Sequence, residues 1–334
     1  MGKLKNCLSI ADLEREARRC MPACVRGYVC GGTEDGQSLA ESLRHFQRLG
    51  FVPRGLRDVH RRSAATTLWG QTYAQPLGFA PTGFAAIVMR DCDAALARVA
   101  RQEQLPFIIS GASTVPLERL QQENDNRCWY QAYLPGNMAR IRPLLQRLQR
   151  AEIPVLVITM DTCVGANREN LQRLRFTVPF RFSPQLLLDG LLHPRWTGGV
   201  FLRTVLTDGI PRFANLAHEM GPAITQDPPH GFRGERDLLT WDCIREIRQR
   251  WPGKLVLKGV MHPDDARLAV ALGAQMAFCG RPQLFGAAVA GEAGIRHAVA
   301  IFQQEILTDM ALLGCSSLQE LGPDLLRELA PAPV

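Results

Sequence analysis

The sequence predicts an α/β protein built on a parallel sheet of β/α units. Two observations carry this prediction: short, almost purely apolar runs recur along the chain, and amphipathic segments separate them. The 334 residues are 46% hydrophobic and 21% charged, an ordinary globular composition that excludes a disordered or fibrous chain. A chain of this length makes one or two domains, and an α/β barrel can occupy all of it as one.

The first part of the chain, 1–75, is predicted to be a helical extension. A helix is expected over 9–30, where Ser9 is a suitable N-cap and apolar residues recur at near-helical spacing. A second helix is expected over 38–49, and it ends at Gly50. The strands begin only after this extension.

Six apolar runs have the length of buried strands. Because amphipathic segments lie between most of them, a run and the segment after it make one β/α unit. Strands one to four fall within 76–161, and the remaining β/α units fall within 237–300. The predicted strands are 76–81, 106–110, 129–134, 155–161, 254–260 and 276–282, and the predicted helices are 92–103, 115–122, 138–151, 237–251 and 263–273.

The stretch 162–236, after the fourth strand, differs from the rest. It holds many Pro and Gly residues and no convincing strand. A loop this long between β/α elements is usually a lid or a binding insertion, so we predict a mobile lid, with plain disorder as the alternative. The end of the chain, 301–334, is predicted to be helical, and the whole of 1–334 to form a single domain.

Neither the net charge nor the cysteines indicate a particular function. The net charge of +7 comes from arginines scattered along the chain, as on solvated helix surfaces, and no nucleic-acid motif accompanies it. The ten cysteines form no C-x-x-C pair and no zinc-ligand set, so we expect free thiols, a cytoplasmic location and no metal. The first residues do not resemble a signal peptide, and no apolar run approaches the ~20 residues of a transmembrane segment.

Polar and small residues collect where the predicted strands end. In β/α barrels the functional groups lie at these carboxyl ends. Each residue alone has a structural explanation, such as a threonine cap or a core tyrosine, but six polar ends in a row indicate a site. In chain order the ends carry Ala80, Pro81, Thr82 and Gly83; Ser110; Gln131 and Tyr133; Thr159, with Arg168 beyond it; Lys258; and Gly280 and Arg281.

These residue types suit a flat, anionic cofactor. Small residues at the first ends allow close approach of a ring, whose carbonyl and NH groups can bond to the hydroxyl and amide side chains of the next three ends. Lys258 could stabilise negative charge on a reduced ring. Gly280 and Arg281 offer a backbone NH and a fixed cation to a phosphate.

The chain resembles the FMN-dependent α-hydroxy-acid dehydrogenase/oxidase family nearly end to end. This resemblance implies a TIM-barrel-like parallel (β/α) barrel, an FMN cofactor, oxidation of a small L-2-hydroxy acid of the lactate, glycolate or mandelate type to the 2-oxo acid, and a homo-oligomer. The segments that carry it are MPACVRGYVCGGTED (21–35), FVPRGLRDV (51–59), PLGFAPTG (76–83), YQAYL (130–134), TMDTCVGANRENLQRLRF (159–176), KLVLKGVMHPDDARLA (254–269), FCGRPQLFG (278–286) and GEAGIRHAV (291–299).

The resemblance also implies a role for each matching residue. Tyr28 and Arg168 would contact the substrate carboxylate, and Tyr133 would hydrogen-bond the substrate. The insertion 162–236 would be the family's mobile loop over the active site. The implied FMN ligands are Ala80, Pro81, Thr82 and Gly83 against the isoalloxazine ring, Ser110, Gln131 and Thr159 on the flavin, Lys258 near N1 and O2, and Gly280 and Arg281 on the phosphate.

Two of the family's motifs have no counterpart in the sequence. One is a Ser-Asn-His-Gly-Gly-Arg-Gln-type segment, whose His is the catalytic base and whose Arg is a second carboxylate clamp. The other is a strand ending in Asp-Gly-Gly, followed by the Arg-Arg-Gly that cradles the phosphate. Val270 instead runs directly into a segment resembling the end of a later helix, 271–274. Two β/α units, roughly 60 residues, are therefore predicted to be absent through an internal deletion.

This absence has a structural and a chemical consequence. Six strands must either close a smaller, distorted barrel or leave two strand edges open. Oxidation of a hydroxy acid needs a base within hydrogen-bond reach, and none is identified. His262, after strand five, and His230, in the insertion, are weak candidates. The other histidines lie away from the strand ends: His45, His60, His193, His218 and His297.

Two functions remain open on the sequence. One is an FMN-dependent oxidoreductase whose turnover is impaired. The other is a catalytically inactive relative that binds flavin or serves as a partner subunit, or an internally deleted product of a full-length enzyme. The sequence does not decide the hydroxy acid, nor whether the electron acceptor is oxygen, a quinone or a cytochrome, and it leaves peripheral membrane contact open.

Overall fold

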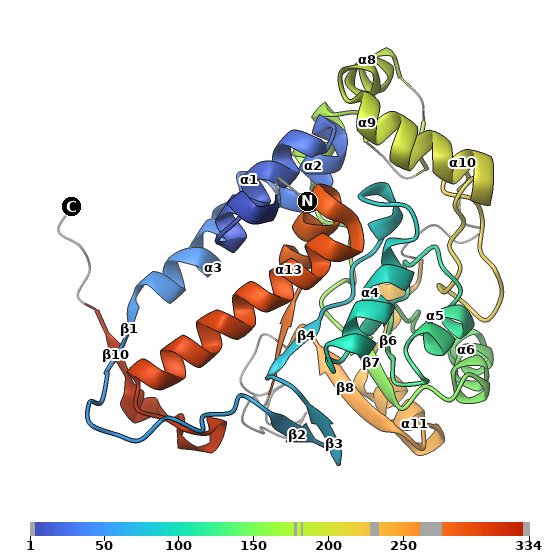
Figure 1. Ribbon diagram of the computed structural model, residues 1–334. Helices are drawn as coiled ribbons and strands as arrows, with labels where there is room; N and C mark the ends of the chain where they lie inside the picture. The colour runs from blue at the N-terminus through green and yellow to red at the C-terminus, as the bar shows by residue number, and fades with distance from the viewer. Residues whose placement is uncertain (1–3, 177–178, 182, 228–233, 261–275, 330–334) are drawn as a thin grey trace.

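The six predicted strands are present, and all of them run parallel. The computed structural model describes residues 4–176, 179–181, 183–227, 234–260 and 276–329 (Figure 1). Each strand is shorter than its apolar run, because residues at one or both ends of the run belong to the neighbouring turns. The strands are β4 (Leu77–Phe79), β5 (Ile108–Ser110), β6 (Trp129–Ala132), β7 (Val155–Thr159), β8 (Lys254–Lys258) and β9 (Ala277–Cys279).

The strands form two ladders joined at one point. One ladder has the order β5-β6-β7-β8, and the other pairs β4 with β9. A parallel bridge between Phe79 and Phe107 connects them, so the spatial order is β9-β4-β5-β6-β7-β8. Among the described residues no ladder joins β8 to β9. Of the two predicted outcomes, the described part of the sheet therefore shows open edges rather than a smaller closed barrel.

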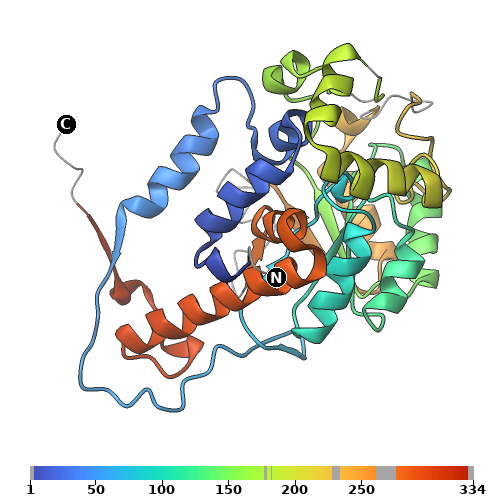
Figure 2. The ribbon, with the colours of Figure 1, turned by 45° about the horizontal axis from the view of Figure 1, so that its top comes forward.

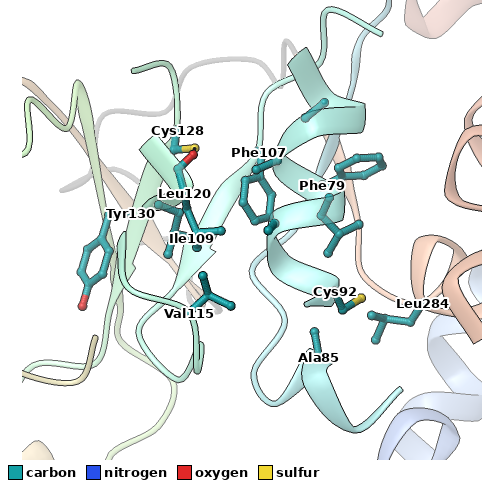
Figure 3. Packing of buried hydrophobic residues seen from close by; sticks show 14 of the residues in the cluster. Phe79, Ala85, Cys92, Phe107, Ile109, Val115, Leu120, Cys128, Tyr130 and Leu284 are labelled. Atoms are coloured by element: carbon teal, nitrogen blue, oxygen red, sulfur yellow. Dashed lines mark hydrogen bonds between the residues drawn. The ribbon is translucent and has the colours of Figure 1, made fainter. Parts of the chain in front are cut away.

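Burial follows this order of strands. Every residue of β5, β6 and β7 is buried, whereas the three central residues of β8 are half-buried and its two lysines are exposed. An inner strand is covered by neighbours on both sides, while an edge strand is covered on one. Figure 3 shows the core beneath the inner strands, where Phe107 and Ile109 pack with Leu120 and Cys92 of the covering helices.

Amphipathic helices cover the outer face of the sheet, as predicted (Figure 1). In the helix Met138–Arg150 the buried side chains are Ile141, Leu144, Leu145 and Leu148, which is the spacing of one helical face, and Asn137 caps its first turn. The predicted helix 263–273 lies outside the described residues. The covering helices are α4 (Cys92–Gln102), α5 (Leu117–Glu123), α6 (Met138–Arg150) and α11 (Trp241–Arg250).

The predicted single helix over 9–30 is wrong, because the chain forms two helices there. They are α1 (Ile10–Cys20) and α2 (Ala23–Cys30), preceded by the 3₁₀ turn Leu4–Asn6. Met21 and Pro22 between them are extended, as expected where proline removes a backbone donor and disfavours the α conformation before it. The predicted cap is confirmed, since Ser9 forms a capping box with Asp12.

The extension 1–75 is helical only in its first part. After α3 (Gln37–Gln47), strand β1 (Leu49–Phe51) pairs antiparallel with β10 (Leu326–Glu328) near the other end of the chain. The hairpin of β2 (Thr66–Leu68) and β3 (Gln71–Tyr73) then turns through Trp69 and Gly70, which both have positive φ, as tight hairpin turns require.

The prediction of C-terminal helices over 301–334 is correct only at its start. Helix α13 spans Pro282–Leu312 and is followed by the 3₁₀ turns Leu318–Glu320 and Pro323–Leu325 and by β10. Gly314, with φ of 69°, ends the helical path because this conformation favours glycine.

By length and composition α13 could cross a membrane, with a mean hydropathy of 1.2 over 18 residues, but half of that window is buried. Figure 2 shows α13 lying beside α1.

The insertion 162–236 contains a series of short helices where the structure describes it. Its helices α8 to α10 form a projecting corner of the molecule (Figure 1). The segment around Asn215 is nevertheless fixed to the body: the buried Asn215 side chain bonds the backbone of Val115 and Leu117. The elements are α7 (Glu169–Arg173), α8 (Pro184–Leu192), α9 (Pro194–Trp196), the π-helix Thr197–Leu202, α10 (Arg203–Asp208) and the 3₁₀ turn Arg236–Leu238.

Candidate functional site

Three predicted residues form a buried polar row across the carboxyl ends of β5, β6 and β7. Ser110 lies opposite Gln131 in the β5–β6 ladder, and Thr159 ends the next strand. The Gln131 amide donates a 2.7 Å hydrogen bond to the Thr159 hydroxyl, and the Ser110 hydroxyl lies 3.4 Å from the Gln131 carbonyl oxygen. Since buried polar groups need partners, this row is held in one arrangement.

The turn after β4, from Ala80 to Gly83, closes over the same end of the sheet. The Ala80 N–H donates to Cys279 O of β9 at 2.9 Å. A Cβ placed on Gly83 would lie 3.1 Å from Ala112, 3.5 Å from the Tyr28 hydroxyl and 3.8 Å from the Ser110 hydroxyl. Gly83 therefore lies where the turn, the extension and the second strand end meet.

Tyr28 reaches this turn from α2. Its hydroxyl donates to Gly83 O at 3.2 Å, and burial raises the pKa of Tyr28 to about 12, although the nearby Arg168 acts in the opposite direction. The Arg168 guanidinium, just before α7, lies 5.8 Å from the centre of the Tyr28 ring. The structure thus brings together the two residues that the resemblance assigned to the substrate carboxylate.

Tyr133 has a neighbour that sequence reasoning missed. The guanidinium of Arg236 lies 4.3 Å from the centre of the Tyr133 ring, and Arg236 is only 8% exposed. In the sequence, Arg236 is simply the last residue of the insertion. A lone arginine before an amphipathic segment carries no signal of burial, so only the tertiary structure could reveal it.

Lys258 ends β8 and stands opposite Thr159 in the β7–β8 ladder. Its side chain is exposed, in keeping with an edge strand. Gly259 after it has φ of 88°, and a Cβ there would collide with Asp161. This close approach fixes the backbone at the carboxyl end of β8.

Gly280 and Arg281 lie at the carboxyl end of β9, just before α13. The Arg281 Nε donates to Val29 O of α2 at 3.0 Å. Nothing lies within 4 Å of a Cβ placed on Gly280. The predicted phosphate-binding pair therefore sits at an open strand end, with its cation held by the C-terminus of α2.

The described histidines lie elsewhere. His297 bonds Cys7 O at 2.6 Å, and His193 bonds Asp189 O at 2.8 Å. The weak candidates His230 and His262 lie outside the described residues. All ten cysteines, which are within the described ranges, are free thiols. In those ranges no group of three or more His, Cys, Asp or Glu side chains could hold a metal ion.

The site fits the ring end of a flavin better than the phosphate end. The Thr82 hydroxyl, in the turn after β4, is buried without a hydrogen-bond partner among the described residues, as expected where a bound group would supply one. Gly83 follows Thr82 in the turn, and a Cβ on Gly83 would lie 3.8 Å from the Ser110 hydroxyl of the buried polar row. The phosphate end shows Gly280 and Arg281 but lacks the family's Arg-Arg-Gly segment in the sequence.

The sequence profile of the FMN-dependent dehydrogenases matches residues 17–273 and 268–328 of this chain. The chain belongs to that family. It is 27% identical to (S)-mandelate dehydrogenase of Pseudomonas putida over 377 residues, covering 97% of this chain and 94% of the relative. It is 28% identical to 2-hydroxyacid oxidase 2 of Homo sapiens over 350 residues, covering 95% of this chain and 97% of the relative.

A solved structure gives the same result for the fold. The crystal structure of the monotopic membrane protein (S)-mandelate dehydrogenase superposes with a TM-score of 0.86, at 26% identity, over 96% of this chain and 99% of that one. The predicted α/β class, with a fold that matches the TIM-barrel mandelate dehydrogenase, and membership of a family of FMN-dependent L-2-hydroxy-acid oxidases and dehydrogenases are thereby confirmed. The roles of the individual site residues stay predictions.

Proposed function

We propose that this chain binds FMN at the carboxyl ends of its strands and receives a small L-2-hydroxy acid beside it. The observation that carries the proposal is the buried row Ser110–Gln131–Thr159, together with the buried Thr82 hydroxyl of the turn after β4, which has no hydrogen-bond partner among the described residues. Such a row offers donors and acceptors at fixed positions to the edge of a flat heterocycle. The family membership supports the choice of FMN.

Each residue has a role that follows from its chemistry. FMN, when bound, supplies the hydride-accepting chemistry of the family. Tyr28 and Arg168 would orient the substrate carboxylate, with Tyr133 donating a further hydrogen bond. The pKa of Tyr28, raised to about 12, keeps its phenol protonated and therefore a donor at neutral pH. The ammonium of Lys258 would stabilise negative charge on the reduced ring.

We propose further that turnover is weak or absent because two β/α units are missing. The alignment with the bacterial relative runs over 377 residues, more than the 334 of this chain, as an internal deletion requires. The absence of a ladder between β8 and β9 among the described residues supports a deletion between these two strands. Loss of a general base typically costs roughly 10²–10⁴-fold in rate. A non-catalytic flavin-binding or partner subunit is the alternative.

The visible spectrum of the purified protein tests the cofactor. We expect flavin bands, or their appearance when FMN is added, with bleaching by lactate, glycolate or mandelate that is slow or absent. Colourless protein that takes up no FMN would remove the cofactor assignment. Bleaching at ordinary enzyme rates would show that a base is present, and would overturn the proposal of impaired turnover instead.

We also propose peripheral contact between the projecting corner and the cytoplasmic face of a membrane. Leucines on α8 and α10 are 58–82% exposed, which is uncommon for so many neighbouring apolar side chains. The similar mandelate dehydrogenase structure is described as a monotopic membrane protein, which supports this proposal. The exposed leucines are Leu187, Leu188, Leu191 and Leu192 of α8 and Leu206 of α10.

A further inference from the structure

The two ends of the candidate flavin site differ in the hydrogen-bonding groups that they offer. At the ring end, Ser110, Gln131 and Thr159 are at most 4% exposed and are bonded to one another. Fixed, buried groups of this kind hold a heterocycle in one orientation. The phosphate end, after β9, is open: nothing lies within 4 Å of a Cβ placed on Gly280, and Arg281 is only half-buried.

Arg281 alone does not offset the charge of a phosphate. A phosphate monoester carries about −1.5 to −2 charges at pH 7, whereas a guanidinium carries one positive charge. The Arg281 guanidinium is also partly engaged, since its Nε donates to Val29 O at 3.0 Å. The nitrogens that remain can form a charge-assisted hydrogen bond with a phosphate, but they leave part of its charge to the solvent.

The neighbouring arginines of the helical extension are directed elsewhere. Burial raises the pKa of Cys30, at the end of α2, and Arg18, Arg281 and Arg26 act in the opposite direction, so all three arginines lie near this thiol. Arg18 is paired with Glu14 of the same helix at 2.5 Å, and Arg26 donates to Arg18 O at 3.2 Å. Both side chains are therefore committed to α1, and only Arg281 follows a strand end.

The start of α13 offers little to a phosphate. Free N–H groups in the first turn of a helix commonly bind phosphate, but the first residue of α13 is Pro282, which has no N–H. The next side chain, Gln283, is 1% exposed, and its amide nitrogen donates to Cys279 O. The same carbonyl accepts from the Ala80 N–H of the turn after β4, so Gln283 lies at the junction of β9, this turn and α13.

The other end of the Gln283 amide is an acceptor without a donor. Because the Cys279 carbonyl only accepts, the amide nitrogen must face it, and Oε1 is left buried with no partner among the described residues. A buried acceptor is destabilising until a donor reaches it. A phosphate dianion brings only acceptor oxygens, whereas the hydroxyl groups of a ribityl chain can donate. This end of the site therefore matches a hydroxyl better than a phosphate.

We propose that this site takes riboflavin, the flavin without a phosphate, nearly as well as FMN. The inference rests on the proposed function, since it requires a flavin ring at the buried polar row. A cradle of three charge-assisted hydrogen bonds would favour FMN by about 10³-fold or more. The one bond that the half-buried Arg281 can add favours FMN by about tenfold at most.

Titration of the full chain with riboflavin and, separately, with FMN tests the proposal, with the quenching of flavin fluorescence as the signal. Low ionic strength is chosen because any attraction between the protein and the phosphate is strongest there. We expect both titrations to saturate, with FMN bound no more than about tenfold more tightly. A larger preference for FMN, or binding of FMN alone, would overturn this inference and leave the proposed function standing. Binding of neither flavin would remove the proposed function and this inference with it.

A variant that gains a preference for phosphate would locate the weak end of the site. Gly280 does not have a positive φ and has open space at its Cβ position, so Gly280→Lys can add an ammonium group there without a clash. We expect it to raise the ratio of FMN affinity to riboflavin affinity about tenfold, and the neutral variant Gly280→Met to leave this ratio unchanged. Arg281→Gln should lower the ratio to about one. Riboflavin affinity reports in each variant whether the site is intact, and equal ratios in Gly280→Lys and Gly280→Met would contradict the inference.

Discussion

The guanidinium of Arg236 stacks on the ring of Tyr133, 4.3 Å from its centre, and joins the end of the insertion to the turn after β6. The neighbouring Glu235 strengthens the same junction, since its backbone oxygen accepts from the Gly136 N–H at 2.6 Å and its carboxylate accepts from Arg140 at 2.9 Å. The contact places a positive charge beside a predicted substrate residue.

Replacing Arg236 by methionine should destabilise the protein. A desolvated cation–π contact is worth about 2 kcal/mol, and methionine keeps the apolar stem while removing the charge. We expect the free energy of unfolding in urea to fall by about 1–2 kcal/mol. The control is Arg245→Met, an exposed arginine paired with Asp242, which should change it by less than about 0.5 kcal/mol. Equal losses would show that the stacking contributes nothing.

Gln131→Leu should weaken FMN binding by at least about tenfold, because it removes the central member of the buried polar row and one hydrogen bond each from Ser110 and Thr159. Quenching of FMN fluorescence on titration with protein measures the affinity. Gln304→Leu, an exposed glutamine on α13, is the matched control and should bind as the parent does. Retention of parental affinity by Gln131→Leu would exclude this row from the flavin site.

Asp93 should make stability fall as the pH rises. It is buried at the start of α4 and bonded to the Ser113 hydroxyl at 2.9 Å, and burial raises its pKa from 3.8 to about 7. The folded state thus prefers the protonated form, so its stabilising contribution is complete below pH 4 and is lost between pH 4 and 7. Asp93→Asn should remove this component, which amounts to at most about 1.4 kcal/mol per pH unit.

The measurement is the difference in unfolding free energy between the parent protein and Asp93→Asn across pH 4 to 8. Asp12→Asn is the control that should show no such variation, because the hydrogen bonds from Ser9 and Arg15 lower the pKa of Asp12 below 3.8 and keep it ionised throughout this range. Its stabilising contribution is present above that pH and is lost as the pH falls through the lowered pKa. If the difference between the parent and Asp93→Asn does not vary with pH, Asp93 is ionised in the folded protein and the prediction is wrong.

Gly294→Ala should destabilise the protein by more than about 2 kcal/mol, a cost typical of overpacking at a close backbone contact. Helix α13 is broken at Ala290 and Gly291, and its two parts meet where Gly286 and Gly294 face each other's backbone. A Cβ on Gly294 would collide with the Gly286 carbonyl. Thermal unfolding measures the loss. Gly199→Ala, where nothing lies within 4 Å of a Cβ, should have little effect, and a comparable loss there would contradict the argument.

The membrane contact predicts a loss of vesicle binding in a double variant, Leu188→Glu with Leu192→Glu. Both leucines are exposed on α8, so their replacement should leave the free energy of unfolding nearly unchanged. Burial of one leucine is worth about 1.5–3 kcal/mol, so co-sedimentation with vesicles of anionic phospholipid should fall at least about tenfold. Leu312→Glu, at the end of α13, is the control. No binding by the parent protein would rule out the contact.

Local sequence patterns determined much of the secondary structure of this protein and the place of part of its site. The buried strands lie where apolar runs predicted them, and the caps at Ser9 and Asn137 follow from side chains that bond their own helix. Ser110, Gln131 and Thr159 could be placed together from sequence because the carboxyl ends of neighbouring parallel strands share one edge of a sheet. These features depend on residues that are close in the sequence, or on the regular spacing of apolar residues along a strand or a helix.

Contacts between distant segments were decided only by the tertiary structure. The pairing of β1 with β10, the stacking of Arg236 on Tyr133 and the hydrogen bonds from the start of α2 to Asp189 of α8 each join segments that carry no local signal for one another. The sequence predicted that six strands form either a smaller closed barrel or a sheet with open edges, but it did not decide between these two outcomes. That choice depends on whether β8 and β9 can approach within hydrogen-bonding distance, which strand tilt and helix packing control together.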